Sequence, residues 1–189
     1  MRAQFRIVMF GIALLSVLPL TAWCENPDPE LWNHVRRAMT EADSFDDRFH
    51  AEVWLKLNST RLENYVEDKN ERIEILTNVH REASRWNLPP SLVLAVIDVE
   101  SAFNKYALSR VYARGLMQIM PFWAEILNVS EQSLMDINTN IRIGCAILAH
   151  YKQTENGDYV QALNRYNGTT DRRKYADKVL QRLSTRWYD

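Results

Sequence analysis

The chain has 189 residues and a formal net charge of −1, with 23 Lys and Arg against 24 Asp and Glu. This balance leaves no basic excess for nucleic-acid binding, so nucleic acid is not an expected partner. With 47% hydrophobic and 11% aromatic residues, but only five Gly and six Pro, the composition indicates one folded domain and argues against a disordered or β-rich chain.

The N-terminal 22 residues differ from the rest of the chain. Two arginines form a positive start, and residues 7–22 are an apolar stretch that ends in small residues. This pattern is typical of a secretory signal peptide, and the stretch is short for a membrane span. We therefore expect a cleavable signal peptide over residues 1–22 and a periplasmic or secreted mature protein. Cleavage after Ala22 or after Cys24, and an uncleaved anchor, all remain open.

The chain contains two cysteines, Cys24 and Cys145. In an oxidising compartment a pair of thiols tends to be joined, so a disulfide between them is the first expectation. A second interpretation is that Cys24 is the lipidated first residue of the mature chain. Trp23 before it is, however, larger than the small residue that usually precedes a lipidated cysteine. In a third, Cys145 is a buried free thiol that packs as a small hydrophobic residue.

The remaining sequence predicts helices. Capping patterns at Asp28 and Ser44 begin two of them, and the second runs through Leu57. Residues 68–86 place apolar side chains at three- and four-residue spacings, as in an amphipathic helix.

Two prolines, Pro89 and Pro90, end that helix and begin the next, because proline fits the first turn of a helix but not its interior. The next helix runs to about Ala102, is apolar on nearly every face and is the expected core helix. Further helices are expected at Pro121, Ser130, Asp136, Asp158 and over 174–187. No segment alternates polar and apolar residues as a strand would, so the predicted fold class is all-α.

The core helix places one carboxylate, Glu100, at the end of the apolar run SLVLAVIDVE. Burial disfavours the charged form of such a group and raises its pKa, which keeps a general acid protonated near neutral pH. Asp98 lies about 200° away around the helix and is expected to face elsewhere.

Three motifs follow in the order ES (residues 100–101), GLMQ (115–118) and YNG (166–168). Together they resemble the soluble lytic transglycosylases, which cleave the glycan strands of bacterial peptidoglycan. The resemblance begins near residue 75 and runs to the C-terminus. It implies a goose-type, lysozyme-like helical fold.

On this resemblance the chain divides into a signal peptide over residues 1–22, a small N-terminal helical extension over 23–70 and a catalytic domain over 71–189. The expected partner is the peptidoglycan glycan strand, and the protein is expected to be a monomer. The sequence does not identify partners in envelope assembly. No cofactor and no metal are indicated, because the four histidines show no metal-ligand spacing.

The resemblance implies cleavage of the MurNAc-GlcNAc β-1,4 bond with Glu100 as a single general acid and then base. The N-acetyl group of the muramic acid would assist, and the C6 hydroxyl would close a 1,6-anhydro ring without water. Two alternatives remain open. One is a hydrolytic muramidase on the same fold, which would need a positioned water and a second carboxylate. The other is a non-catalytic peptidoglycan-binding or assembly protein.

Further site residues come from positions that match the family. Tyr166 is the second predicted catalytic residue, with its hydroxyl within reach of Glu100. The predicted substrate-binding residues are Ser109, Met117, Gln118 and Asn167.

Three of these assignments carry a structural alternative. Met117 also fits the core, Asn167 also fits a turn with Gly168, and Ser109 also fits an ordinary loop serine. Asn140 and Gly144 resemble the family's Asn-x-x-x-Gly pattern, for which close helix packing is the favoured explanation.

The chain departs from the family at Tyr112, which stands where the family has the first glycine of Ser-x-x-Gly-Ala-x-Gly-Leu-Met-Gln. A tyrosine does not adopt glycine-only backbone angles without cost. Either the loop is reshaped here, or the glycine is not essential.

Overall fold

The computed structural model describes residues 48–168 and 173–188. This part of the chain forms seven α-helices and one 3-10 helix, and two isolated β-bridges are its only extended pairings. The predicted all-α class is therefore confirmed. The helix expected at Asp28 and the cap expected at Ser44 lie outside the described residues.

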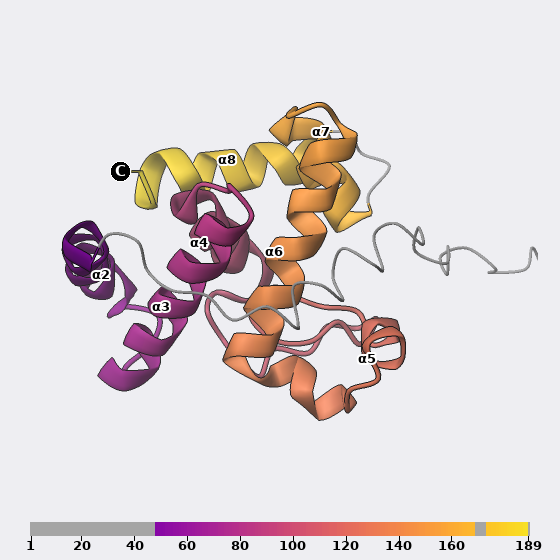
Figure 1. Cartoon of the computed structure of the whole chain (residues 1–189), viewed down its shortest axis with the longest axis horizontal. Helices are drawn as coiled ribbons and strands as arrows, with labels where there is room; N and C mark the ends of the chain where they lie inside the picture. Colours follow the sequence, from indigo (N-terminus) through magenta and orange to yellow (C-terminus); the bar gives the residue numbers. More distant parts are fainter. Residues whose placement is uncertain (1–47, 169–172, 189) are drawn as a thin grey trace, which may run out of the picture.

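The helices follow the predicted order along the chain (Figure 1). They are α2 (Arg48–Leu62), α3 (Lys69–Arg85), α4 (Pro90–Ser101), α5 (Phe122–Leu127), the 3-10 helix η1 (Glu131–Met135), α6 (Ile137–Thr154), α7 (Tyr159–Asn167) and α8 (Lys174–Arg186). Asp68, Asp136 and Asp158 cap α3, α6 and α7, because each carboxylate accepts a hydrogen bond from a backbone N–H of the following turn. Helix α2 runs five residues beyond the predicted Leu57.

The core forms around α4, whose side chains from Leu92 to Ile97 are at most 2% exposed. Helix α4 packs against α3 and α8, α3 packs against α2 and α6, and α7 packs against α6 and α8. In Figure 1, α6 runs through the middle of the molecule, α8 crosses the top of the view and α5 lies at the lower right. This packing buries α4 on all sides, as its uniformly apolar sequence predicted.

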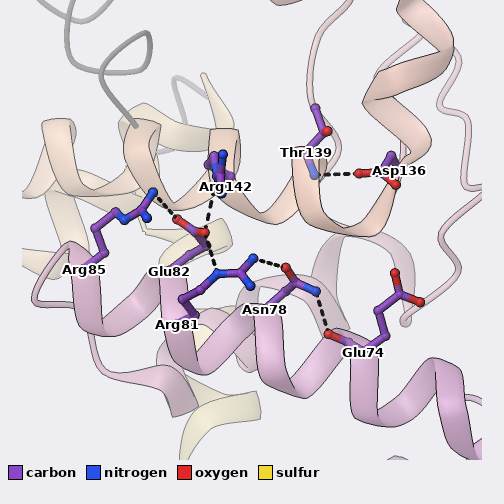
Figure 2. A network of polar contacts seen from close by, with 8 residues as sticks. All are labelled: Glu74, Asn78, Arg81, Glu82, Arg85, Asp136, Thr139 and Arg142. Atoms are coloured by element: carbon purple, nitrogen blue, oxygen red, sulfur yellow. Dashed lines mark hydrogen bonds and ion pairs between the residues drawn. The ribbon is translucent and has the colours of Figure 1, made fainter. Parts of the chain in front are cut away.

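A buried ionic network joins α3 to α6 (Figure 2). Glu82 is fully buried, and its carboxylate lies 3.1 Å from Nε of Arg81, 3.3 Å from Arg85 and 3.3 Å from Nε of Arg142. Arg81 and Arg85 belong to α3, whereas Arg142 belongs to α6. A carboxylate removed from water needs such partners, so the network fixes how the two helices pack.

None of the helices in residues 48–168 and 173–188 is long and apolar enough to cross a membrane. The N-terminal stretch that was predicted to be a signal peptide lies outside these residues.

Candidate active site

Glu100 lies in the last turn of α4 and is half-buried. Burial raises the pKa of its carboxyl above the usual value, and this effect exceeds the opposing influence of the Tyr175 hydroxyl and the Lys178 ammonium group. The predicted half-burial and raised pKa are both confirmed. Glu100 is therefore a carboxyl group suited to hold a proton to higher pH than an exposed glutamate does.

Tyr175, in the first turn of α8, is the residue that contacts the Glu100 carboxylate. Its hydroxyl donates a 2.6 Å hydrogen bond to Oε1 of Glu100. The side chain is buried, and burial together with the neighbouring Glu100 charge raises the pKa of Tyr175 well above its usual value. No sequence motif marked this residue as part of the site. The sequence feature that could have indicated Tyr175 is its position on the apolar face of the last helix, beside Ala176 and Val179.

Tyr166, near the end of α7, is the tyrosine that the YNG motif had indicated. Its hydroxyl donates a 2.8 Å hydrogen bond to the backbone carbonyl of Met117. Burial, and after it the charge of Glu100, raise the pKa of Tyr166 well above its usual value. The hydrogen bond to Glu100 itself comes from Tyr175.

The GLMQ motif forms a turn between two bridged residues, Arg114 and Ile119. The side chain of Asn140, from α6, holds this turn in place through hydrogen bonds. Its Oδ1 accepts a 2.7 Å hydrogen bond from the Met117 N–H, and its Nδ2 donates a 2.8 Å hydrogen bond to the Arg114 carbonyl. Gly115 has φ +74°, and a Cβ there would lie 2.5 Å from Nδ2 of Asn140. Glycine is thus required by both backbone angle and space.

Ser101 joins this turn to the end of α4. Its hydroxyl donates hydrogen bonds of 2.8 Å to the Leu116 carbonyl and 3.2 Å to the Ile97 carbonyl. The turn therefore lies directly against the helix end that carries Glu100. The Glu-Ser motif pairs one acid with one positioning hydroxyl.

Met117 does not line an exposed surface, because its side chain is fully buried. It packs against Gly144 of α6, where a Cβ would lie 2.4 Å from the Met117 sulfur. This burial favours the core alternative for Met117, and substrate binding by its side chain stays an untested prediction. Close packing also explains the glycine of the Asn-x-x-x-Gly pattern, as favoured from the sequence.

Gln118 is half-buried, and part of its side-chain amide can still bind another group. Its Nε2 donates to the carbonyls of Gly115, at 3.0 Å, and Ala107, at 3.3 Å. Among the described residues its Oε1 accepts no hydrogen bond, so this oxygen remains an acceptor for an incoming N–H or hydroxyl group. Asn167 is exposed at the end of α7, and Gly168 after it ends the helix at φ +67°.

Ser109 closes a short hairpin in the segment between α4 and α5. Its Oγ accepts hydrogen bonds from the N–H groups of Val111, at 3.2 Å, and Ala113, at 3.0 Å. Its backbone N–H bonds the Ala113 carbonyl, and its carbonyl accepts from the Tyr112 N–H. Within the described residues this hydroxyl shapes the loop rather than contacting Glu100.

Asp98 faces away from Glu100, as predicted. Its Oδ2 accepts hydrogen bonds from the Trp187 indole N–H, at 3.0 Å, and the Tyr65 hydroxyl, at 3.1 Å. Arg182 and Arg186 of α8 also lie 3.7 and 3.4 Å from its oxygens. The carboxylate is therefore engaged in holding α8 onto α4.

Cys145 is fully buried in α6, and burial raises the pKa of its thiol well above the usual value. Its predicted partner Cys24 lies outside the described residues, and within them Cys145 is a free thiol. Within residues 48–168 and 173–188, no cluster of three or more His, Cys, Asp or Glu side chains could hold a metal ion.

The candidate site at the end of α4 thus combines a half-buried acid, one buried and one partly buried tyrosine, and a turn held by Asn140. Residues 77–185 match the family described as Transglycosylase SLT domain. This match covers more than half of the chain, so the protein belongs to the Transglycosylase SLT domain family.

Among its relatives is a membrane-bound lytic murein transglycosylase C from Actinobacillus pleuropneumoniae serotype 5b (strain L20). It is 48% identical over 48 residues, which cover 25% of this chain and 13% of the relative. A protein of the same description from Yersinia pestis (strain Pestoides F) is 34% identical over 106 residues, covering 48% of this chain and 30% of the relative. The chain thus spans less than a third of the length of these relatives.

Among solved structures, the chain is similar to the 70 kDa soluble lytic transglycosylase from Escherichia coli. The TM-score is 0.47 at 26% sequence identity, and the alignment covers 71% of this chain and 24% of that chain. A complex of the 70-kDa soluble lytic transglycosylase with bulgecin A gives a TM-score of 0.46 at the same identity and coverage.

Proposed function

We propose that the protein is a peptidoglycan lytic transglycosylase that cleaves the MurNAc-GlcNAc β-1,4 bond. The observation that carries this proposal is the state of Glu100 in a chain of this family. Its pKa is raised by burial, and its orientation is fixed by the 2.6 Å hydrogen bond from Tyr175. A carboxyl group that stays protonated toward neutral pH can donate a proton to a glycosidic oxygen.

The proposed reaction uses Glu100 twice. The carboxyl group protonates the leaving oxygen as the bond to C1 of the muramic acid breaks, and the N-acetyl carbonyl oxygen of the same sugar bonds to C1. The Glu100 carboxylate then takes the proton of the C6 hydroxyl as O6 displaces the acetamido oxygen from C1. A 1,6-anhydro sugar and a protonated Glu100 result, and no water is consumed.

The orientation of Asp98 supports this single-carboxyl scheme. A hydrolase or an enzyme with a covalent intermediate usually places a second carboxylate across the scissile bond. Asp98, the acid closest to Glu100 in the sequence, is instead committed to Trp187 and Tyr65. With Asp98 engaged elsewhere, the C6 hydroxyl already present in the bound sugar is the proposed nucleophile, because it has the highest effective concentration.

Digestion of purified sacculi in ¹⁸O-labelled water, followed by mass spectrometry of the released muropeptides, tests the proposal. Products with 1,6-anhydro termini and no ¹⁸O are expected from the wild-type protein, and none from Glu100→Gln. One ¹⁸O at each new reducing end would identify a hydrolytic muramidase instead. Release that persists at the wild-type rate in Glu100→Gln would contradict the role of this residue.

The proposed location is the periplasm or the cell exterior, with residues 1–22 as a signal peptide, 23–70 as an N-terminal extension and 71–189 as the catalytic domain. Outside the cytoplasm Cys24 and Cys145 would form a disulfide that ties this extension to α6. Peptide mapping of protein purified from the envelope without reductant tests both points. Two free thiols, or a mature chain that lacks Cys24, would contradict the disulfide.

A further inference from the structure

Left-handed backbone conformations are concentrated in the segment that follows Glu100. Seven non-glycine residues of the described part have a positive φ, and three of them are asparagines, which adopt this conformation readily. The other four are Ala102, Phe103, Tyr112 and Gln118, with φ of 48, 62, 66 and 51°. All four lie within 17 consecutive residues next to the site, where strained backbone is often functional.

Contacts within the fold account for three of these four conformations. Ala102 ends α4, and its N–H bonds the Asp98 carbonyl. Phe103 is 1% exposed and packs its ring against those of Tyr65 and Trp187. Gln118 is held by the two hydrogen bonds of its side-chain amide. In each case packing or hydrogen bonding offsets the conformational cost.

Tyr112 is held through its backbone N–H, which donates a 3.1 Å hydrogen bond to the Ser109 carbonyl, and no side-chain contact among the described residues offsets its conformational cost. Its side chain is 65% exposed, and its ring makes no aromatic or cation contact with them. It stands at the third loop position of the hairpin closed by Ser109 and Ala113, a position that glycine usually fills because of its positive φ. A glycine there would cost less conformational free energy, and the exposed ring of Tyr112 is not needed to close the hairpin.

We propose that Tyr112 binds substrate by stacking its ring on the apolar face of a sugar in the glycan strand. This inference rests on the proposed function. The hairpin is fixed to the site, because the Gly115 N–H and the Gln118 amide both bond the Ala107 carbonyl at its base, at 2.9 and 3.3 Å. An exposed tyrosine offers an apolar ring and a polar hydroxyl, which match the C–H face and the hydroxyl groups of a pyranose.

The test distinguishes the effect of losing the Tyr112 ring from the effect of relieving the backbone strain at this residue. Tyr112→Asn removes the ring, while asparagine tolerates the left-handed conformation. We expect its melting temperature to equal or exceed that of the wild type, while its apparent KM for release of muropeptides from sacculi rises about five- to tenfold. The kcat should change little. Tyr112→Phe keeps the ring and should keep the KM.

A matched control is Tyr188→Asn, which removes another exposed tyrosine. Tyr188 is 57% exposed and lies just beyond the C-terminal end of α8, whereas Tyr175 lies in its first turn, so the length of this helix, about 20 Å, separates them. This variant should bind and cleave sacculi as the wild type does. A KM for Tyr112→Asn that equals the control value would overturn the proposal and assign the exposed ring to another partner, such as a protein.

Co-sedimentation with sacculi in a Glu100→Gln background gives a readout that does not need catalysis. The added Tyr112→Asn substitution should weaken binding by the same factor of about five to ten. If the wild type shows no cleavage, the proposed function fails, yet this binding comparison still decides the role of Tyr112. If cleavage is normal and binding is unchanged by Tyr112→Asn, only the inference about Tyr112 fails.

Discussion

The Tyr175 hydroxyl and the Glu100 carboxylate are joined by a 2.6 Å hydrogen bond across 75 residues of sequence. Helices α4 and α8 pack along each other, and this contact brings the first turn of α8 to the last turn of α4. Two opposing influences therefore act on the carboxyl group. Burial raises its pKa, while the donated hydrogen bond favours the ionised form and lowers it.

The first prediction concerns the pH dependence of Tyr175→Phe. Loss of the hydroxyl removes a group that lowers the pKa of Glu100, so that pKa should rise further. Because the general acid must be protonated, the alkaline limb of the kcat/KM profile should move to higher pH. The kcat should fall about three- to tenfold, since the carboxyl group loses its orienting partner.

Tyr166→Phe is the matched control for this measurement. Its hydroxyl bonds the Met117 carbonyl, so its loss should slow the reaction with a smaller shift of the alkaline limb. The products should be unchanged in both variants. An alkaline limb at the wild-type pH in Tyr175→Phe would show that the hydrogen bond does not control the proton on Glu100.

The second prediction concerns the stability of Glu100→Gln. The pKa of Glu100 is raised in the folded protein, so between its unfolded value of about 4.5 and the folded value the native state binds more protons than the unfolded state. The free energy of unfolding of the wild type must then fall as pH rises through that window. Glutamine does not titrate. Glu100→Gln should therefore melt above the wild type at pH 7 to 8, and this advantage should shrink toward pH 4.

Thermal melts of both proteins in one buffer series measure this difference. A difference in melting temperature that is independent of pH would mean that ionisation of the Glu100 carboxyl group does not destabilise the folded protein. The same series also tests whether the inactive variant is folded, which the cleavage experiments require.

The third prediction separates Asp98 from Glu100. Asp98→Ala removes the acceptor of the Trp187 and Tyr65 hydrogen bonds and leaves two arginines of α8 without this carboxylate. The free energy of unfolding should fall by about 3 kcal/mol, as for other buried ion pairs that lose one partner. Asp98→Asn keeps an acceptor and should lose less. Denaturant titrations measure both values, and the alkaline limb of the activity profile should stay where it is in the wild type.

Much of this fold could be predicted from the sequence because local signals were strong. The caps at Asp68, Asp136 and Asp158 begin the helices that were expected there, and the apolar run before Glu100 forms the core helix. The position of Asp98 followed from helical geometry alone. These features depend on residues that are neighbours along the chain.

The site was harder to predict because its contacts join distant segments. Tyr175 comes from a helix that no motif marked, and only the packing of α8 on α4 brings it to Glu100. Met117 occupies a matched motif, yet the missing side chain at Gly144 lets it pack into the core. Tyr112 was recognised as a departure from the family, and the structure adds that it takes the left-handed conformation with its ring exposed.

The last prediction concerns the contact between Met117 and Gly144. A Cβ on residue 144 would lie 2.4 Å from the Met117 sulfur, so Gly144→Ala should cost about 1 to 3 kcal/mol despite the better helix propensity of alanine. Met117→Ala alone should cost about 2 to 5 kcal/mol, because it leaves a cavity in the core.

The double variant distinguishes this steric contact from two independent effects. Met117→Ala removes the sulfur at 2.4 Å and the terminal methyl group at 2.8 Å but keeps the Cβ at 2.8 Å, so Gly144→Ala should cost less in the Met117→Ala background than in the wild type without becoming neutral. The coupling energy from the four free energies of unfolding should then exceed about 1 kcal/mol. Additivity within about 0.5 kcal/mol would contradict the contact. Since Met117 also presents the carbonyl that Tyr166 binds, Gly144→Ala should slow cleavage as well, by displacing the turn that lies against Glu100.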